Sequence, residues 1–289
     1  MTAGAKPFER VAVLGVGLMG GSVAAGLRAR EIAGRVVAYS TGDDAERARS
    51  LGLIDSVATS PARAVEGADL VVLAAPIPAL PGLFSEIAPE LRPGVVLTDC
   101  ASTKKSTIAA ARAALGEAFA RFVPGHPIVG GERRGPDAAR GDLFEGATVV
   151  LCPVPETAPD ASERVTQTWR ALGATVVAID AGEHDALYAQ VSHWPHALSF
   201  ALCAAIASGE RADSALRLAG AGLRDATRIA AAPAALWADI VLDNRDAVLD
   251  CALAFERQVQ AITAAIREGD RAALLAYFEL AGDWRRRMR

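Results

Sequence analysis

The feature that most constrains this chain is a glycine-rich turn placed between a short apolar strand and an amphipathic helix. Residues 11–14 (VAVL) form the apolar run, and GxGxxG follows at once over residues 15–20. In this context Gly15 permits a tight turn, Gly17 lets the backbone approach a pyrophosphate, and Gly20 lets the helix pack against the strand. The pattern predicts a dinucleotide site whose phosphate loop consists of Gly15, Gly17, Leu18, Met19 and Gly20.

Apolar runs and helical segments alternate through the first 180 residues. Further runs without polar alternation occur at residues 36–39, 70–73, 95–97, 148–151 and 174–178. Strands buried on both faces and alternating with helices are typical of βαβ units in a parallel sheet. After about Asp180 the pattern is helical only. We therefore predict an α/β fold, with an N-terminal Rossmann-type parallel-sheet domain over 1–181 and an all-helical C-terminal domain over 182–289.

The helical half carries apolar residues at spacings of three to four, which predicts one long helix. These residues are Leu242, Val248, Leu249, Leu253, Phe255, Val259 and Ile262. Together with the rest of this half they present more apolar surface than a lone helical appendage buries. We expect a homodimer interface here, with a packed monomeric core as the alternative.

Composition argues against several classes of partner and location. The net charge is −4, so a basic nucleic-acid-binding face is not expected. The longest apolar helical run, over 197–207, is too short to cross a membrane. The chain has four cysteines without a CxxC motif and no leader-like N-terminus, which fits a reduced cytoplasm and predicts no metal site.

The second predicted strand bears on the choice of cofactor. It ends in Tyr39-Ser40-Thr41, without the acidic residue that holds the ribose 2′-hydroxyl in NAD-selective sites. Ser40 and Thr41 are therefore assigned to cofactor binding, and Arg47 is the nearest candidate partner for a 2′-phosphate. Both NAD and NADP remain open.

Further motifs follow in a fixed order along the chain. They are D-x-x-S-x-K at residues 99–104, GHP-x-x-GGE at 125–132, SH-x-PH at 192–196 and TRIA at 227–230. With the glycine loop, this series resembles the prephenate and arogenate dehydrogenases of tyrosine biosynthesis, over nearly the whole chain. The resemblance implies NAD(P)-dependent oxidative decarboxylation of prephenate to 4-hydroxyphenylpyruvate, of arogenate to tyrosine, or of both.

Ser102 and His126 are the predicted catalytic residues. Both follow the carboxyl ends of predicted strands, where an open α/β sheet binds its ligand. A neutral imidazole there suits proton abstraction from a hydroxyl as hydride leaves the same carbon. By resemblance, His126 engages the ring hydroxyl, and Ser102 bonds the same hydroxyl or orients His126. Lys104 and Lys105 either steer an anionic substrate or form a solvated helix start.

The resemblance places substrate-binding residues in the helical half, namely Ser192, His193, His196, Arg228 and Trp237. Ser192 and His196 are four residues apart and share a helix face, and Pro195 is expected to kink that helix. The guanidinium of Arg228 suits a substrate carboxylate. Trp237 either lines the pocket or fills the helical core.

Three other functions fit the sequence less well. β-Hydroxyacid dehydrogenases use a catalytic lysine in the second domain, but no lysine follows Lys105 in this chain. A metal hydrolase built on His193 and His196 would have Pro195 between its ligands and lacks a third ligand at standard spacing. A non-catalytic NAD(P)-binding regulator would not account for the ordered series of polar motifs.

Overall fold

The computed structural model describes residues 6–131 and 133–288, so Glu132 of the GHP-x-x-GGE motif lies outside the described residues. The N-terminal part is built on a six-stranded parallel sheet in the order β3-β2-β1-β4-β5-β6. Its strands are β1 (Phe8–Leu14), β2 (Ala33–Tyr39), β3 (Ser56–Val57), β4 (Leu70–Leu73), β5 (Val96–Asp99) and β6 (Phe122–Val123). The strand order reverses direction on the two sides of β1, which is where an α/β sheet opens its ligand crevice.

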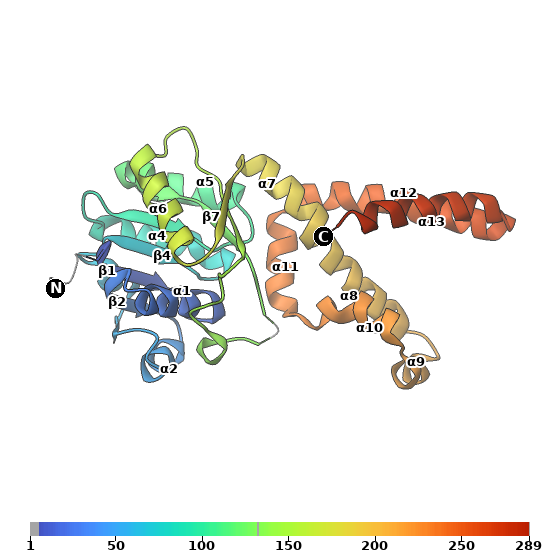
Figure 1. The fold of residues 1–289 in the computed structure, drawn as a ribbon, viewed down its shortest axis with the longest axis horizontal. Coiled ribbons are helices and arrows are strands. Elements are labelled where there is room, and N and C mark those ends of the chain that lie inside the picture. The colour runs from blue at the N-terminus through green and yellow to red at the C-terminus, as the bar shows by residue number, and fades with distance from the viewer. Residues whose placement is uncertain (1–5, 132, 289) are drawn as a thin grey trace.

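Helices cover both faces of this sheet (Figure 1). They are α1 (Leu18–Ala29), α2 (Asp44–Ser50), α3 (Pro61–Val65), α4 (Leu80–Ile87), α5 (Lys105–Ala114) and α6 (Pro159–Ala171), with short 3₁₀ turns η1 (Ile77–Ala79), η2 (Ala88–Glu90), η3 (Gly116–Arg121) and η4 (Pro136–Ala138). Along β1, Val11 and Val13 belong to one buried cluster, while Ala12 and Leu14 belong to the other. Burial on both faces explains why the strand has no polar alternation, and it confirms the predicted fold class.

Two of the predicted strands belong to a separate, three-stranded sheet rather than to the parallel one. This sheet contains β7 (Gly125–Ile128), β8 (Thr148–Leu151) and β9 (Thr175–Ala178), and β7 runs antiparallel to β8. The chain leaves the first sheet at Pro124, which has no N–H to continue the ladder. The N–H of Gly125 donates instead to the side chain of Asp99, at 2.9 Å.

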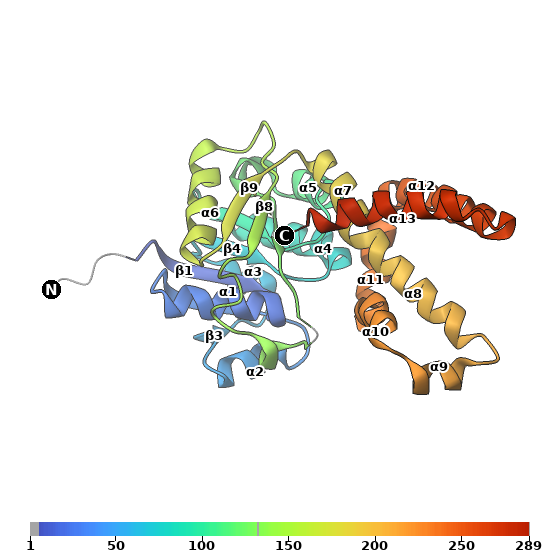
Figure 2. The same ribbon diagram turned by 45° about the vertical axis from the view of Figure 1, so that its right-hand side comes forward.

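The helical half extends away from the α/β part, and α12 and α13 pack as an antiparallel pair at its far end (Figures 1 and 2). Its elements are α7 (Ala181–Tyr188), the π-helical turn η5 (Ala189–His193), α8 (Trp194–Ala207), α9 (Ala212–Leu218), α10 (Ala221–Thr227), the 3₁₀ turn η6 (Arg228–Ala231), α11 (Ala234–Asp243), α12 (Arg245–Glu268) and α13 (Arg271–Arg286). Within the described ranges, no helix combines the length and apolarity needed to cross a bilayer.

The prediction of one helix over 242–262 is wrong at its start. Leu242 belongs to α11, and the chain breaks at Asn244 before α12 begins. The break has a tertiary cause: Asn244 is buried, and its amide nitrogen donates to the carbonyl of Asp185 at 2.7 Å. The expected disturbance at Pro195 takes the form of η5, because a proline removes one N–H from the helical ladder.

Candidate active site

The glycine loop has the geometry of a phosphate cradle. Gly15 has a φ of +91°, and a Cβ there would lie 2.6 Å from the carbonyl oxygen of Ala74. A Cβ on Gly20 would lie 1.9 Å from the carbonyl oxygen of Gly15. Gly17 caps the N-terminus of α1, and the space where its Cβ would point is open to 4 Å. A helix N-terminus with an open backbone approach suits a pyrophosphate, so the residues present fit the predicted dinucleotide.

The end of β2 shows what surrounds the expected cofactor residues. Ser40 is half-buried and Thr41 is exposed, directly after Tyr39. Arg47, on α2, is engaged by the carboxylate of Asp137 in η4, with its Nε 3.0 and 3.1 Å from the two oxygens. The candidate cation for a 2′-phosphate therefore already has an anionic partner.

A chain of hydrogen bonds links His126 on β7 to α7. Nδ1 of His126 lies 2.8 Å from Nε2 of His184, and Nδ1 of His184 lies 2.8 Å from Oδ1 of Asp185. Asp185 also accepts the backbone N–H groups of Lys104 at 2.8 Å and Lys105 at 2.9 Å. The Asp185 carboxylate thus joins α7 to the start of α5, and β7 is linked to it through His184. His126 lies in a strand, not in the loop that the sequence predicts, but it still comes directly after the carboxyl end of β6.

The protonation states along this chain follow from its electrostatics. Burial raises the pKa of Asp185, but hydrogen bonds from His184 and the two backbone N–H groups outweigh burial and lower it, so the group is a carboxylate. Burial also lowers the pKa of His184. Burial, reinforced by the charge of Lys104, lowers the pKa of His126 well below 6.5. Both imidazoles are therefore neutral at neutral pH.

The position of each proton follows from these states. A carboxylate only accepts, so Nδ1 of His184 carries a proton and donates it to Asp185. Nε2 of His184 then bears a lone pair and accepts from Nδ1–H of His126. Nε2 of His126 is left with its lone pair, which is the state a proton acceptor needs.

His193 is linked to this chain of hydrogen bonds through Asn244. Its ring is buried, and its Nδ1 lies 3.1 Å from the Asn244 amide nitrogen that also donates to Asp185. Since that amide nitrogen is a donor, Nδ1 of His193 accepts and Nε2 carries the proton. Burial lowers the pKa of His193 to about 4. Tyr188 completes the cluster, with ring centroids 4.8 Å from His126 and 4.5 Å from His184.

The structure brings three other predicted substrate residues together in a second group. The ring of His196 stacks on Trp237, with centroids 3.4 Å apart and planes at 15°. Its Nδ1 donates to the backbone carbonyl of Ser192 at 2.9 Å, which confirms that the two residues share a helix face. Burial lowers the pKa of His196, and the nearby positive charge of Arg228 contributes to that lowering. Arg228 itself is exposed, in η6.

The segment after β5 departs from expectation at Lys104. Ser102 is half-buried in the bend between β5 and α5, and Lys105 is exposed. Lys104 is fully buried and ion-paired with Asp99, so it is neither a solvated helix start nor a group that meets substrate. Its partner Asp99 is the first residue of the same D-x-x-S-x-K motif, so the available signal was an acid and a lysine five residues apart across a strand end.

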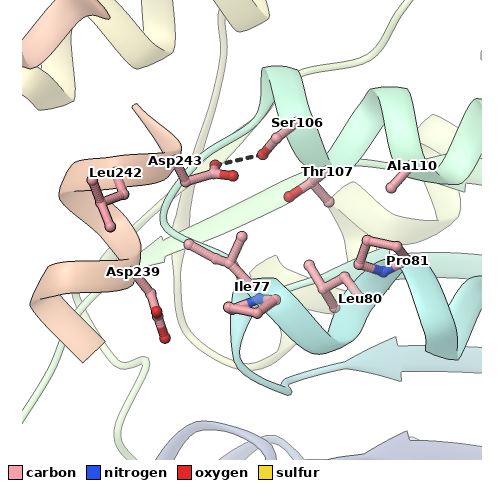
Figure 3. Close-up of a pocket in the computed structure, with 10 residues that line it drawn as sticks. Ile77, Leu80, Pro81, Ser106, Thr107, Ala110, Asp239, Leu242 and Asp243 are labelled. Atoms are coloured by element: carbon pink, nitrogen blue, oxygen red, sulfur yellow. Dashed lines mark hydrogen bonds between the residues drawn. The ribbon is translucent and has the colours of Figure 1, made fainter. Parts of the chain in front are cut away.

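A cleft of about 360 Å³ lies between α4, α5 and α11 (Figure 3). Ile77, Leu80 and Pro81 form its apolar wall, and Ser106 bonds Asp243 across its upper edge at 2.5 Å. Among the described residues, its lining includes none of the site residues predicted from sequence. The histidine chain, not this cleft, is the candidate catalytic centre.

Comparison with known proteins identifies the family of most of the chain. Residues 23–178 match the family model for the prephenate dehydrogenase nucleotide-binding domain, and residues 180–280 match the model for the prephenate dehydrogenase dimerization domain. The chain belongs to the prephenate dehydrogenase family. The resemblance seen in the ordered motifs is thereby confirmed.

Individual members of the prephenate dehydrogenase family are similar throughout. The cyclohexadienyl dehydrogenase of Zymomonas mobilis is 33% identical over 278 residues, covering 94% of this chain and 93% of that protein. The prephenate dehydrogenase of Bacillus subtilis is 31% identical, covering 96% and 75%. The Aquifex aeolicus prephenate dehydrogenase structure with hydroxyphenyl propionate and NAD⁺ has a TM-score of 0.88 at 29% identity, covering 99% of both chains. A Synechocystis arogenate dehydrogenase structure has a TM-score of 0.81 at 25% identity, covering 96% and 98%.

The sequence motifs assign no role to His184, Asp185, Tyr188 or Asn244. The signal that was available is the adjacent His-Asp pair, since a carboxylate beside an imidazole commonly fixes its tautomer. What no spacing shows is that the partner of His184 lies 58 residues away, on β7.

Proposed function

We propose that this protein catalyses the NAD(P)-dependent oxidative decarboxylation of prephenate, arogenate or both. The observation that carries the proposal is the chain from Asp185 through His184 to His126, which leaves an imidazole lone pair beside the carboxyl ends of the strands. Membership of the prephenate dehydrogenase family supports the substrate class, and the NAD⁺ complex of the Aquifex aeolicus relative supports the cofactor.

In the proposed reaction, Nε2 of His126 accepts the proton of the ring hydroxyl. His126 stays neutral until that moment because its pKa is lowered, and the proton it gains is shared with the chain that ends at Asp185. When bound, the nicotinamide supplies the hydride acceptor. Loss of CO₂ from the same ring yields an aromatic product. Ser102, in the bend after β5, is proposed to bond the same hydroxyl.

The second group of residues is proposed to hold the rest of the substrate. Arg228 is exposed beside His196, where its guanidinium can bind a substrate carboxylate in bidentate fashion. The stacked pair of His196 and Trp237 supplies a flat apolar wall for a ring. Ser192 and His193, on η5, complete the proposed contacts.

We propose a division of labour between residues 1–181, which bind the dinucleotide, and residues 182–289, which bind substrate and form a homodimer. The family model for the second segment is a dimerization domain. Large apolar side chains on α12 and α13 are more than 40% exposed: Leu249, Leu253, Val259, Ile266, Leu275, Phe278, Leu280 and Trp284. A second copy of the chain is the proposed cover for this surface. The cytoplasmic location remains a prediction.

The test is turnover by the purified protein, followed as nicotinamide reduction. Prephenate and arogenate are each assayed with NAD and with NADP. Turnover of at least one substrate supports the proposal. A folded protein that binds NAD(P) but turns over neither substrate would favour the non-catalytic regulator instead.

A further inference from the structure

Lys104 is a buried lysine beside the proposed catalytic centre, in a chain with only three lysines. The side chains of Lys104 and of Asp99, its ion-pair partner, are both 0% exposed. Removing two such charges from water is costly before their attraction is counted. Lys105, the next residue, lies in solvent. The burial of Lys104 therefore points to a structural or functional role that the exposed Lys105 does not have.

The buried pair holds the peptide group that precedes His126. Nζ of Lys104 donates to the carbonyl of Gly125 at 2.6 Å as well as to the carboxylate of Asp99. Oδ1 of Asp99 accepts the N–H of Gly125 at 2.9 Å, and Oδ2 accepts the N–H of Ala101 at 2.9 Å. Both backbone polar groups of Gly125 are thus bonded to one ion pair.

The fit around Gly125 is also close. A Cβ at this position would lie 2.8 Å from the carbonyl oxygen of Asp99 and 3.0 Å from Oγ1 of Thr98. The backbone immediately before His126 therefore lies against the end of β5, with the Lys104 ammonium on its carbonyl side. A small displacement of this strand would move the imidazole away from His184, whose ring is itself held by Asp185.

We propose that Lys104, paired with Asp99, is a positioning residue for His126. The pair fixes the Gly125 peptide, which sets where the His126 ring stands relative to His184 and to the substrate hydroxyl. Lys104 does not touch the substrate, since its side chain is fully enclosed. The proposal rests on the assignment of His126 as the proton acceptor.

The charge of Lys104 gives this role a measurable signature. Titratable groups from four elements surround the imidazole. They are Asp99 at the end of β5, Lys104 at the start of α5, His184, Asp185 and Tyr188 on α7, and His193 on η5. After burial, the positive charge of Lys104 is the largest of the influences that lower the pKa of His126. Removing that charge should raise the pKa, whereas a general loss of stability would reduce activity equally at all pH values.

The experiment compares Lys104→Met with wild type in the full-length protein, after circular dichroism and NAD binding show a folded state. We expect kcat to fall roughly 10-fold or more and the acidic limb of the kcat profile to move up by about one pH unit. Titration of ¹³C-labelled histidine by NMR, assigned with His126→Asn among only four histidines, should show the same rise. Lys105→Met, the matched control, should leave the limb and the His126 titration in place.

The remaining outcomes also decide the matter. A folded Lys104→Met enzyme with an unmoved limb overturns the proposal. If Lys104→Met does not fold, the double variant Asp99→Asn/Lys104→Met leaves no unpaired buried charge, and it should fold, bind NAD and still lose kcat. Wild-type kcat in the double variant, or failure of both variants to fold, also overturns positioning. An acidic limb that survives in His126→Asn would instead refute the role of His126 itself.

Discussion

Nδ1 of His126 lies 2.8 Å from Nε2 of His184, so a strand of the α/β part and the first helix of the helical half share one hydrogen bond. Because His184 is bonded on its other side to Asp185, this contact leaves Nε2 of His126 as the free lone pair. The reactivity of one ring nitrogen is thereby set by a carboxylate two groups away.

The first prediction concerns His126→Asn. The variant should lose roughly 10²–10⁴ in kcat, the usual contribution of a positioned base. In wild type, kcat should fall as pH drops through the pKa of His126, because protonation removes the acceptor. Since burial lowers that pKa, the limb should lie well below 6.5. The limb should vanish in His126→Asn, measured as kcat against pH at saturating substrate.

His196→Asn is the matched control for this profile. It removes a histidine of the second group, so the acidic limb should remain and NAD binding should be unchanged. If His196→Asn loses the limb while His126→Asn keeps it, the proton acceptor has been assigned to the wrong residue.

A second prediction concerns Asp185→Asn. The carboxylate accepts three N–H groups, from His184 and from the backbone of Lys104 and Lys105. An amide has one acceptor oxygen and no charge. Either its NH₂ group faces the N–H of Lys105, or it faces His184 and the tautomer of that ring is lost. We expect kcat to fall roughly 10²-fold or more. Asp180→Asn, which keeps a good N-cap on α7, should leave kcat near wild type; a wild-type profile in Asp185→Asn would contradict the hydrogen-bond chain.

Arg228→Ala should act through substrate affinity. A carboxylate contact made equally before and during reaction contributes to KM, and losing about 1.5–3 kcal/mol would raise KM roughly 10–100-fold with kcat less changed. The measurement is steady-state kinetics with prephenate. Arg217→Ala, on exposed α9, serves as the control for charge. If Arg228→Ala keeps the wild-type KM, Arg228 is a surface residue that does not bind the substrate.

Cofactor preference should depend on Asp137. This carboxylate engages Arg47, so wild type is expected to use NAD better than NADP. Asp137→Ala frees the guanidinium for a 2′-phosphate, and kcat/KM for NADP relative to NAD should rise about 10-fold. Asp142→Ala, which breaks the pair with Arg140, is the control and should leave the ratio alone. An unchanged ratio in Asp137→Ala would mean that the 2′-position lies away from Arg47.

The homodimer prediction is tested by light scattering. Wild type at micromolar concentration should show twice the chain mass of 29.9 kDa. Leu253→Glu places a charge on the exposed apolar surface of α12 and should shift the mass to that of one chain. Leu51→Glu, at an exposed leucine of the α/β part, should remain dimeric. A wild-type protein with the mass of one chain would contradict the proposal that a second copy covers the apolar surface of α12 and α13.

The sequence predicted the parallel sheet well because its strands are buried on both faces and read as unbroken apolar runs. The apolar runs do not cover three of the strands, for physical reasons. β3 and β6 have two residues each, too few to show any period, and β7 (Gly125–Ile128) contains glycine and proline. The apolar period also predicts a single helix that includes Asn244. The structure ends α11 at this point, where Asn244 makes a tertiary contact with Asp185 that the period does not show.

The site residues likewise fall into those that the sequence motifs predict and those that depend on distant partners. Ordered motifs pointed to His126, Ser192 and His196, and the structure bonds His196 to the backbone of Ser192, another predicted residue. The partner of His126 is His184, for which the motifs gave no role. The roles of Lys104 and Asp185 depend on partners 21 and 81 residues distant. Such partners follow from how β5, β7 and α7 pack, which no local pattern encodes.

The backbone N–H groups of Lys104 and Lys105 end on a carboxylate of α7, so the two parts of the chain are not interchangeable modules. A chimera that joined this dinucleotide-binding half to the helical half of a relative would inherit both folds yet have to rebuild this junction. The tautomer of His126 therefore depends on both halves of the chain, because His184 and Asp185 of the helical half determine it. Divergence in either half is constrained by the other, even at positions that contact neither substrate nor cofactor.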